Sequence, residues 1–206
     1  DNDEVLMNTA VVTVTDAVSA FQAVTLNGFT NAKVTLNSVE DTYANIQTIK
    51  SIPDGEVDMG AAVVKVTDTV NMAKVDDLRT YTTGDITLTS VTEVKAGIAE
   101  INGFTDVILS TANITVSDDV SKAEADTINA YNDVSGTVTL TSVTDNFANV
   151  GALFVTDGIS IATSDLKVTD TTTLANATVL DGYTTGEVTL DNVTDSFAHV
   201  QSIHDL

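Results

Sequence analysis

Apolar residues alternate with threonine along four short segments of the chain. The segments are Val34-Thr35-Leu36, Ile86-Thr87-Leu88, Val138-Thr139-Leu140 and Val188-Thr189-Leu190. A period of two residues is typical of a β-strand with one buried face, so each segment predicts a strand. A second short strand, of the form Ser-Val-Thr or Lys-Val-Thr, is predicted directly before the acidic residues that follow.

Apolar residues recur at every third position after Asp41 and after Asp195, which predicts a short helix with one apolar face after each acid. These positions are Tyr43, Ile46, Ile49 and Ile52, and Phe197, Val200, Ile203 and Leu206. An Asp at the start of a helix accepts hydrogen bonds from its first N–H groups, so the acids are predicted to cap these helices. The predicted caps are Asp16, Asp41, Asp68, Asp118, Asp145, Asp170 and Asp195.

The acids form two interleaved series that repeat along the whole chain. The first series, Asp16, Asp68, Asp118 and Asp170, has spacings of 52, 50 and 52 residues. The second series, Asp41, Glu93, Asp145 and Asp195, has spacings of 52, 52 and 50 residues. The sequence therefore predicts four repeats of about 51 residues with boundaries near 16, 68, 118 and 170, each split into two half-units of 25–27 residues.

A unit of this length cannot bury its apolar face alone, whereas stacked copies bury it and bring their strands side by side in parallel. We therefore predict an α/β fold: one right-handed solenoid domain over residues 1–206, with about eight coils of 25–27 residues, each with short parallel strands and one short helix. Turns such as Tyr81-Thr82-Thr83-Gly84 and Gly182-Tyr183-Thr184-Thr185-Gly186 are expected to use glycine for positive φ. The alternative is two doubly wound domains, which need longer helices and do not require a strict period.

The two ends of the chain are in phase with the repeat. Residues 3–16 match residues 55–68 position for position, and residues 197–206 match residues 43–52. Neither end has the polar cap expected of a solenoid, so we expect a domain open at both ends that docks head to tail with other copies. The predicted end-to-end interface comprises Val5, Met7, Val12, Val200, Ile203 and Leu206. Two alternatives stay open: one period of a longer tandem array, or a cut that falls at this phase by chance.

The composition excludes several classes of protein. Eight Lys and Arg against 30 Asp and Glu give a net charge of −22, which argues against a nucleic-acid partner. The absence of Cys excludes a disulfide scaffold, and no apolar stretch is long enough to insert into a membrane. No catalytic motif is present, so we expect no enzyme; His199 and His204 occupy positions that hold other residues in the other repeats.

The acidic residues have one alternative role. Calcium is bound by clustered carboxylates, so a Ca²⁺ cofactor is possible, although the glycine-rich repeat of calcium-binding β-rolls is absent. The candidate ligands are Asp1, Asp3, Asp76, Asp77, Asp118 and Asp119. Otherwise no metal or cofactor is expected.

The phrases Val-Thr-Asp-Thr-Thr-Thr-Leu-Ala-Asn-Ala (168–177) and Ser-Val-Thr-Asp-Asn-Phe-Ala-Asn-Val (142–150) resemble the tandem repeats of giant cyanobacterial and proteobacterial cell-surface and extracellular matrix proteins. The resemblance implies an extracellular or cell-surface adhesin, surface-layer or matrix-fibre role and carries no catalytic residues. We expect a structural repeat protein that stacks into a filament or surface layer. The alternative is an adhesin stalk or ligand-binding solenoid that uses the turn residues Phe29, Tyr81, Tyr131 and Tyr183, or a threonine face of the ice-binding type.

Overall fold

The computed structural model describes residues 6–53, 56–132 and 135–206, and it is an α/β structure of parallel strands and short helices. The chain forms two compact units. Unit 1 contains Asp1–Ser90 and Gly103–Leu109, and unit 2 contains Val91–Asn102 and Ser110–Leu206. The prediction of one solenoid domain over residues 1–206 remains a prediction.

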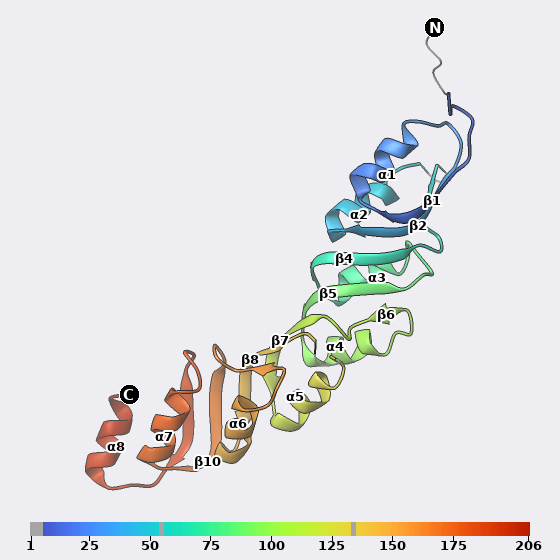
Figure 1. Cartoon of the computed structure of the whole chain (residues 1–206). Coiled ribbons are helices and arrows are strands. Elements are labelled where there is room, and N and C mark those ends of the chain that lie inside the picture. Colours follow the sequence, from blue (N-terminus) through green and yellow to red (C-terminus); the bar gives the residue numbers. More distant parts are fainter. Residues whose placement is uncertain (1–5, 54–55, 133–134) are drawn as a thin grey trace. The chain divides into compact units, whose positions relative to one another are not determined.

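In unit 1, long strands alternate with short helices (Figure 1). The long strands, in their order in the sheet, are β1 (Val12–Val18), β2 (Val34–Asp41), β4 (Val63–Val70) and β5 (Ile86–Glu93), whose residues from Val91 onward belong to unit 2. The helices are α1 (Ala20–Asn27), α2 (Tyr43–Lys50) and α3 (Met72–Leu78). Two short strands complete the unit: β3 (Val57–Asp58) pairs with β2, and β6 (Val107–Ile108) pairs with β5.

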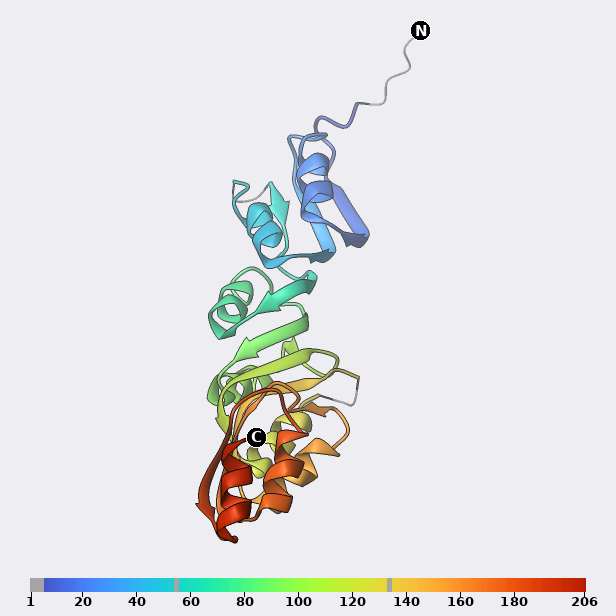
Figure 2. The same ribbon diagram turned by 90° about the vertical axis from the view of Figure 1, so that its left-hand side faces the viewer.

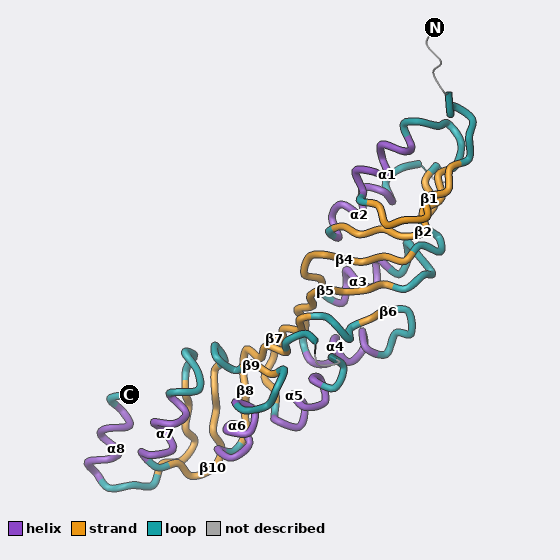
Figure 3. The backbone as a smooth tube through the Cα atoms, in the orientation of Figure 1, coloured by secondary structure: helices purple, strands orange, loops and turns teal. Residues whose placement is uncertain are grey.

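Unit 2 repeats this plan, as the alternation of strand and helix in Figure 3 shows. Its long strands, in sheet order, are β7 (Asn113–Val120), β8 (Val138–Asp145), β10 (Asp165–Thr172) and β11 (Val188–Val193). The short strand β9 (Ile159–Ser160) pairs with β8. The helices are α4 (Lys95–Asn102), α5 (Lys122–Asn129), α6 (Phe147–Phe154), α7 (Leu174–Asp181) and α8 (Phe197–His204).

We call a long strand together with the helix that follows it a module. Within a unit, a helix packs on the strand of the next module: α1 contacts β2, α5 contacts β8 and α6 contacts β10. The helices α1 and α2 also contact each other, and Figure 2 shows them from a second side. The predicted succession of parallel strands and short helices is therefore confirmed.

Two kinds of junction alternate between successive modules. At the first kind, β1–β2, β7–β8 and β10–β11 pair in parallel along most of their length, with one irregularity in register. At the second kind, β2–β4 and β8–β10, only the second half of one strand pairs with the first half of the next. The first half of β2 then pairs with β3, and that of β8 with β9. Because the two kinds alternate, the structural period is two modules, which explains a sequence period near 51 residues.

The alternating strand residues build the core. Val34 is 0% and Leu36 is 2% exposed, while Thr35 between them is only half-buried. From α2, Ile46 and Ile49 meet this layer at 0% and 2% exposure. Burial of a Val, Leu or Ile side chain contributes about 1.5–3 kcal/mol each. The repeated apolar residues are therefore the main source of stability in each module.

The expected role of glycine in the turns is wrong. Among the described residues, the only glycine with positive φ is Gly158, at 80°. Gly84 and Gly186 are instead places where two segments approach closely: an added Cβ would lie 2.4 Å from the carbonyl oxygen of Ala62 and 2.3 Å from that of Ser164. Glycine is favoured there because any side chain would collide with the neighbouring backbone.

Candidate docking surface

A recurrent contact along the chain ties α1, α2, α4, α5, α6 and α7 to the module that follows each of them. An Asp near the end of the long strand accepts a hydrogen bond from the first N–H of the helix in the preceding module. The pairs are Asp41–Ala20 at 2.9 Å, Asp68–Tyr43 at 2.7 Å, Asp118–Lys95 at 2.7 Å, Asp145–Lys122 at 2.9 Å, Asp170–Phe147 at 2.8 Å and Asp195–Leu174 at 3.0 Å. The first N–H groups of a helix have no partner within the helix, and they carry the positive end of its dipole. The carboxylates therefore join successive modules.

This contact corrects the role predicted for the acids, because none of them occupies the N-cap position of the helix in its own module. The N-cap residues are Ser19, Thr42, Asn71, Ser121, Asn146, Thr173 and Ser196. The helix that follows each first-series Asp begins four residues after it, which leaves the carboxylate free to reach the neighbouring helix. Asp16 is exposed, and the described part of the chain has no helix before it.

The second-series carboxylates make more hydrogen bonds than the first. Asp41 also accepts from the N–H of Thr42 and from the side chain of Asn45. Partial burial opposes ionisation of Asp41, but these hydrogen bonds outweigh it and the pKa of Asp41 is lowered. In Asp145 hydrogen bonds likewise outweigh the effect of partial burial, so the pKa of its carboxyl is lowered too. In Asp195, the N–H of Leu174 is the largest cause of a lowered pKa, followed by Ser196 and His199.

Side chains make a further contact at the second kind of junction, between the end of one helix and the turn after the next helix. The Lys50 amine lies 5.9 Å from the centre of the Tyr81 ring in unit 1. At the equivalent positions in unit 2, the rings of Phe154 and Tyr183 stack with centroids 4.3 Å apart. Both contacts are favourable, the first as a cation–π pair and the second as an aromatic stack.

The last module of unit 2 exposes residues whose counterparts are core residues. Val193 is 38% and Val200 is 43% exposed, whereas Val143 and Val150 at the equivalent positions are 0% exposed. None of the residues of α8 is buried, and Phe197 is 86% exposed. A cavity of about 330 Å³ opens here between α7, β11 and the residues at the end of α8. We call this surface the C-terminal face.

The first module of unit 1 exposes its core residues in the same way. Val14 and Leu26 are only half-buried, whereas Val66 and Leu78 at the equivalent positions are 0% exposed. With Phe21 and Phe29 they line a shallow, open groove of about 320 Å³. We call this surface the N-terminal face.

Phe21 departs from the repeat. It is the second residue of α1, and it is 79% exposed. The other helices have alanine at their second position, at Ala44, Ala73, Ala96, Ala123, Ala148, Ala175 and Ala198. The N-terminal face therefore carries an extra aromatic ring.

The described residues of the predicted interface lie on these two faces or beside them. Met7 is 37% and Leu206 is 56% exposed, while Val12 and Ile203 are half-buried. Val200 belongs to the C-terminal face, as described above. Val5 lies outside the described residues.

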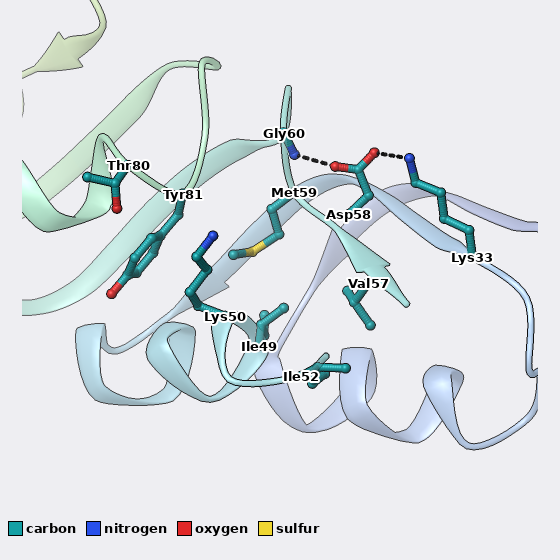
Figure 4. Close-up of a pocket in the computed structure, with 10 residues that line it drawn as sticks. All are labelled: Lys33, Ile49, Lys50, Ile52, Val57, Asp58, Met59, Gly60, Thr80 and Tyr81. Carbon is teal, nitrogen blue, oxygen red and sulfur yellow. Dashed lines mark hydrogen bonds and ion pairs between the residues drawn. The ribbon is translucent and has the colours of Figure 1, made fainter. Parts of the chain in front are cut away.

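Unit 1 also holds a partly open pocket of about 330 Å³ at the junction between its second and third modules (Figure 4). Ile49, Val57 and Met59 form its apolar wall, and Tyr81 and Lys50 lie on one side. Lys33 pairs with Asp58 at 2.6 Å, and Asp58 also accepts from the N–H of Gly60. The charges of Lys33 and Asp58 in the lining of this pocket are thus paired with each other.

The calcium candidates do not converge in the part of the chain that the structure describes, where no three metal-binding side chains come together. Asp77 accepts from Tyr43, Gln47 and Tyr81, and Asp119 accepts from Ser142. Asp118 accepts from Lys95, and Asp76 is exposed. Asp1 and Asp3 lie outside the described residues.

The remaining predicted groups are the two histidines and the turn aromatics Phe29 and Tyr131. His199 contacts Asp195 at 2.6 Å within the last module, and His204 contacts Asp205 at 3.4 Å. Phe29 is 51% exposed, and Tyr131 is half-buried. Of the helices in the described ranges, none combines the length and the apolar character that crossing a membrane requires.

Comparison of the chain with family models, curated proteins and solved structures gave no match.

Proposed function

We propose that this chain is a structural repeat protein, a right-handed solenoid of about eight coils that stacks head to tail into a filament or surface layer. The observation that carries the proposal is the exposure of core positions at both faces. Val193, Val200, Val14 and Leu26 keep the apolar side chains of an internal module but lack the neighbour that covers them there. A face of this kind is completed by another module, because exposed apolar surface and unpaired strand edges favour association.

The parallel strands support a head-to-tail arrangement. A C-terminal face differs from an N-terminal face, so contact between the two is heterologous and builds an open filament where the rotation between copies does not close a ring. The same contact would join successive periods of a longer tandem array. A filament grown in this way exposes the acidic surface along its whole length, which keeps it soluble.

Electron microscopy and sedimentation velocity of the purified chain test this proposal at several concentrations, with and without Ca²⁺. We expect filaments or a concentration-dependent series of assemblies. Val200→Asp places a charge on the C-terminal face and is expected to prevent assembly. Val155→Asp changes an exposed valine of an internal module, 77% exposed, and is the matched control. Monomers alone under every condition contradict the proposal.

We also propose an extracellular or cell-surface location, supported by the acidic composition and by the resemblance of residues 142–150 and 168–177 to repeats of bacterial cell-surface proteins. Labelling of intact source cells with an antibody against the chain tests it. Labelling only after the cells are made permeable contradicts it.

The pocket beside Tyr81 favours a second candidate function, an adhesin or ligand-binding module that uses the turn aromatics. Beads coated with the chain are then expected to attach to bacterial cells, and Tyr81→Ser is expected to reduce attachment while the circular dichroism spectrum stays unchanged. Tyr131→Ser is the comparison, since the pocket does not include Tyr131. Unchanged attachment of both variants contradicts this function.

A further inference from the structure

The internal junctions of the second kind provide a template for contact between two copies. Their contacts in unit 1 recur in unit 2 at equivalent residues. The strand pairing Ser38–Asp41 with Val63–Val66 in unit 1 corresponds to Ser142–Asp145 with Asp165–Val168 in unit 2. The helix N–H bonds to Asp68 and Asp170 correspond, as do the ring contacts at Tyr81 and Tyr183.

Each residue that makes a contact in these internal junctions has a counterpart at the equivalent repeat position on one of the two terminal faces. On the C-terminal side, Asn192–Asp195 corresponds to Ser38–Asp41, Phe197 to Tyr43 and His204 to Lys50. On the N-terminal side, Val11–Val14 corresponds to Val63–Val66, Asp16 to Asp68 and Phe29 to Tyr81. All of these counterparts lie in the described part of the chain.

We infer, on the basis of the proposed function, that a second copy occupies the C-terminal face in the register of the internal junctions. In this junction Asn192–Asp195 at the end of β11 pairs in parallel with Val11–Val14 of the second copy, Phe197 N–H donates to Asp16, and the His204 ring packs on Phe29. The partner is thus a second copy of this chain, bound by its N-terminal module.

The chemistry of the paired positions favours this register. Asn192 faces Val11, Val193 faces Val12, Thr194 faces Thr13 and Asp195 faces Val14, so no two like charges meet. The N–H of Phe197 begins α8 and lies at the positive end of the helix dipole, where a carboxylate is stabilising. Asp16 is exposed and has the sequence position of the carboxylates that fill this role inside the chain.

Cysteine cross-linking tests the register directly, because the chain contains no native cysteine. Asn192→Cys and Val11→Cys are single variants at exposed positions. In the inferred register their Cα atoms lie about 4.8 Å apart, within the reach of a disulfide. Mild oxidation of a mixture of the two variants is expected to give a covalent dimer. The double variant is expected to give a ladder of longer covalent oligomers.

Thr13→Cys in place of Val11→Cys is the matched control. Thr13 is exposed on the same face of β1, but because it lies two residues further along the strand it is about 8 Å from Asn192 in this register, which is too far for a disulfide. Circular dichroism verifies that each variant is folded. Dimers with the Val11→Cys variant and not with the Thr13→Cys variant support the register. Assembly by sedimentation with cross-linking to neither, or equally to both, overturns the register and leaves the proposed function standing; no assembly overturns both.

Asp16→Ala tests the hydrogen bond in the junction. It is expected to weaken association about tenfold, the effect of losing one hydrogen bond to a charged group. Asp76→Ala removes the same charge from an exposed site away from the face and, by reducing repulsion, is expected to leave association unchanged or stronger. Equal effects of the two variants contradict a specific bond to Asp16.

Discussion

At the scale of single residues, the position of each carboxylate oxygen decides which helix an acidic residue accepts a hydrogen bond from. Asp41 directs one oxygen to the N–H of Ala20 in the preceding module and the other to Thr42 and Asn45 in its own. A single carboxylate thus joins two modules while a separate residue, Thr42, caps the local helix. Aspartate is suited to this position because its two oxygens accept several hydrogen bonds at once.

Asp41→Asn is expected to lower the free energy of unfolding by about 1–3 kcal/mol at pH 7, because the amide has one acceptor oxygen and no charge. Urea unfolding followed by circular dichroism measures the change. Asp76→Asn in the same unit is the control, and we expect it to change stability by less than about 0.5 kcal/mol. Equal losses in the two variants would show that total charge, and not the inter-module contact, is responsible.

The lowered pKa values of Asp41, Asp145 and Asp195 predict a dependence of stability on pH. A carboxyl whose pKa is lower in the folded chain stabilises the fold above its unfolded pKa, about 3.9 for Asp, and loses this contribution as pH falls through the folded value. We therefore expect the urea concentration at the midpoint of unfolding to decrease as the pH is lowered below about 4. The decrease should be smaller in Asp41→Asn; an identical pH profile would argue against a contribution from Asp41.

At the scale of the elements, the helices are too short to be stable alone, since isolated helices below about 12 residues are marginal in water. Hydrogen bonds at the ends of these helices are therefore important for their stability. Ser121 and Glu124 form a complete capping box on α5, and Glu124 also pairs with Lys95 at 2.8 Å. The Lys95 bond is the largest cause that lowers the pKa of Glu124, to about 2. The N-cap residue of α7, Thr173, makes no such side-chain bond.

Ser121→Ala is expected to destabilise the chain by about 0.5–2 kcal/mol, the usual cost of losing an N-cap side chain. Thr173→Ala is the comparison and is expected to cost clearly less, because its hydroxyl does not cap the helix. Thermal unfolding of both variants provides the measurement. A loss for Thr173→Ala as large as that for Ser121→Ala would contradict this difference between the two caps.

At the scale of the whole molecule, charge and apolar surface act in opposite directions. Each copy carries a net charge of −22, which opposes association, while the two faces carry exposed core residues that favour it. At 0.1 M salt the Debye length is about 10 Å, so repulsion between charges further apart than this is largely screened. Apolar contacts are left intact.

Raising the NaCl concentration is therefore expected to shift sedimentation towards larger assemblies, with the smallest species at low salt. The Val200→Asp variant serves as the control and should respond weakly to salt. Assemblies that dissociate as salt rises would show that ion pairs between copies, rather than apolar faces, hold them together.

The sequence determined the local structure of this protein. The two-residue period of Val34-Thr35-Leu36 predicted a buried strand, and the three-residue spacing after Asp41 predicted a short helix; both are present at those positions. These patterns are informative because burial of one face depends on neighbours that are close in sequence. The period near 51 residues was also visible without any structure.

Only the tertiary structure decided which modules each residue joins. The sequence around Asp68 is compatible with a cap for α3 as well as with a bond to α2, because the sequence does not say which helix lies nearer in space. The alternation between full and half strand pairing, and the approach of the Ala62 carbonyl to Gly84, depend on backbone segments that the local pattern does not place. Equivalent residues in successive repeats have nearly the same chemistry, so the sequence offers several equal partners for each group. Which of them forms the hydrogen bond or close contact depends on position in space.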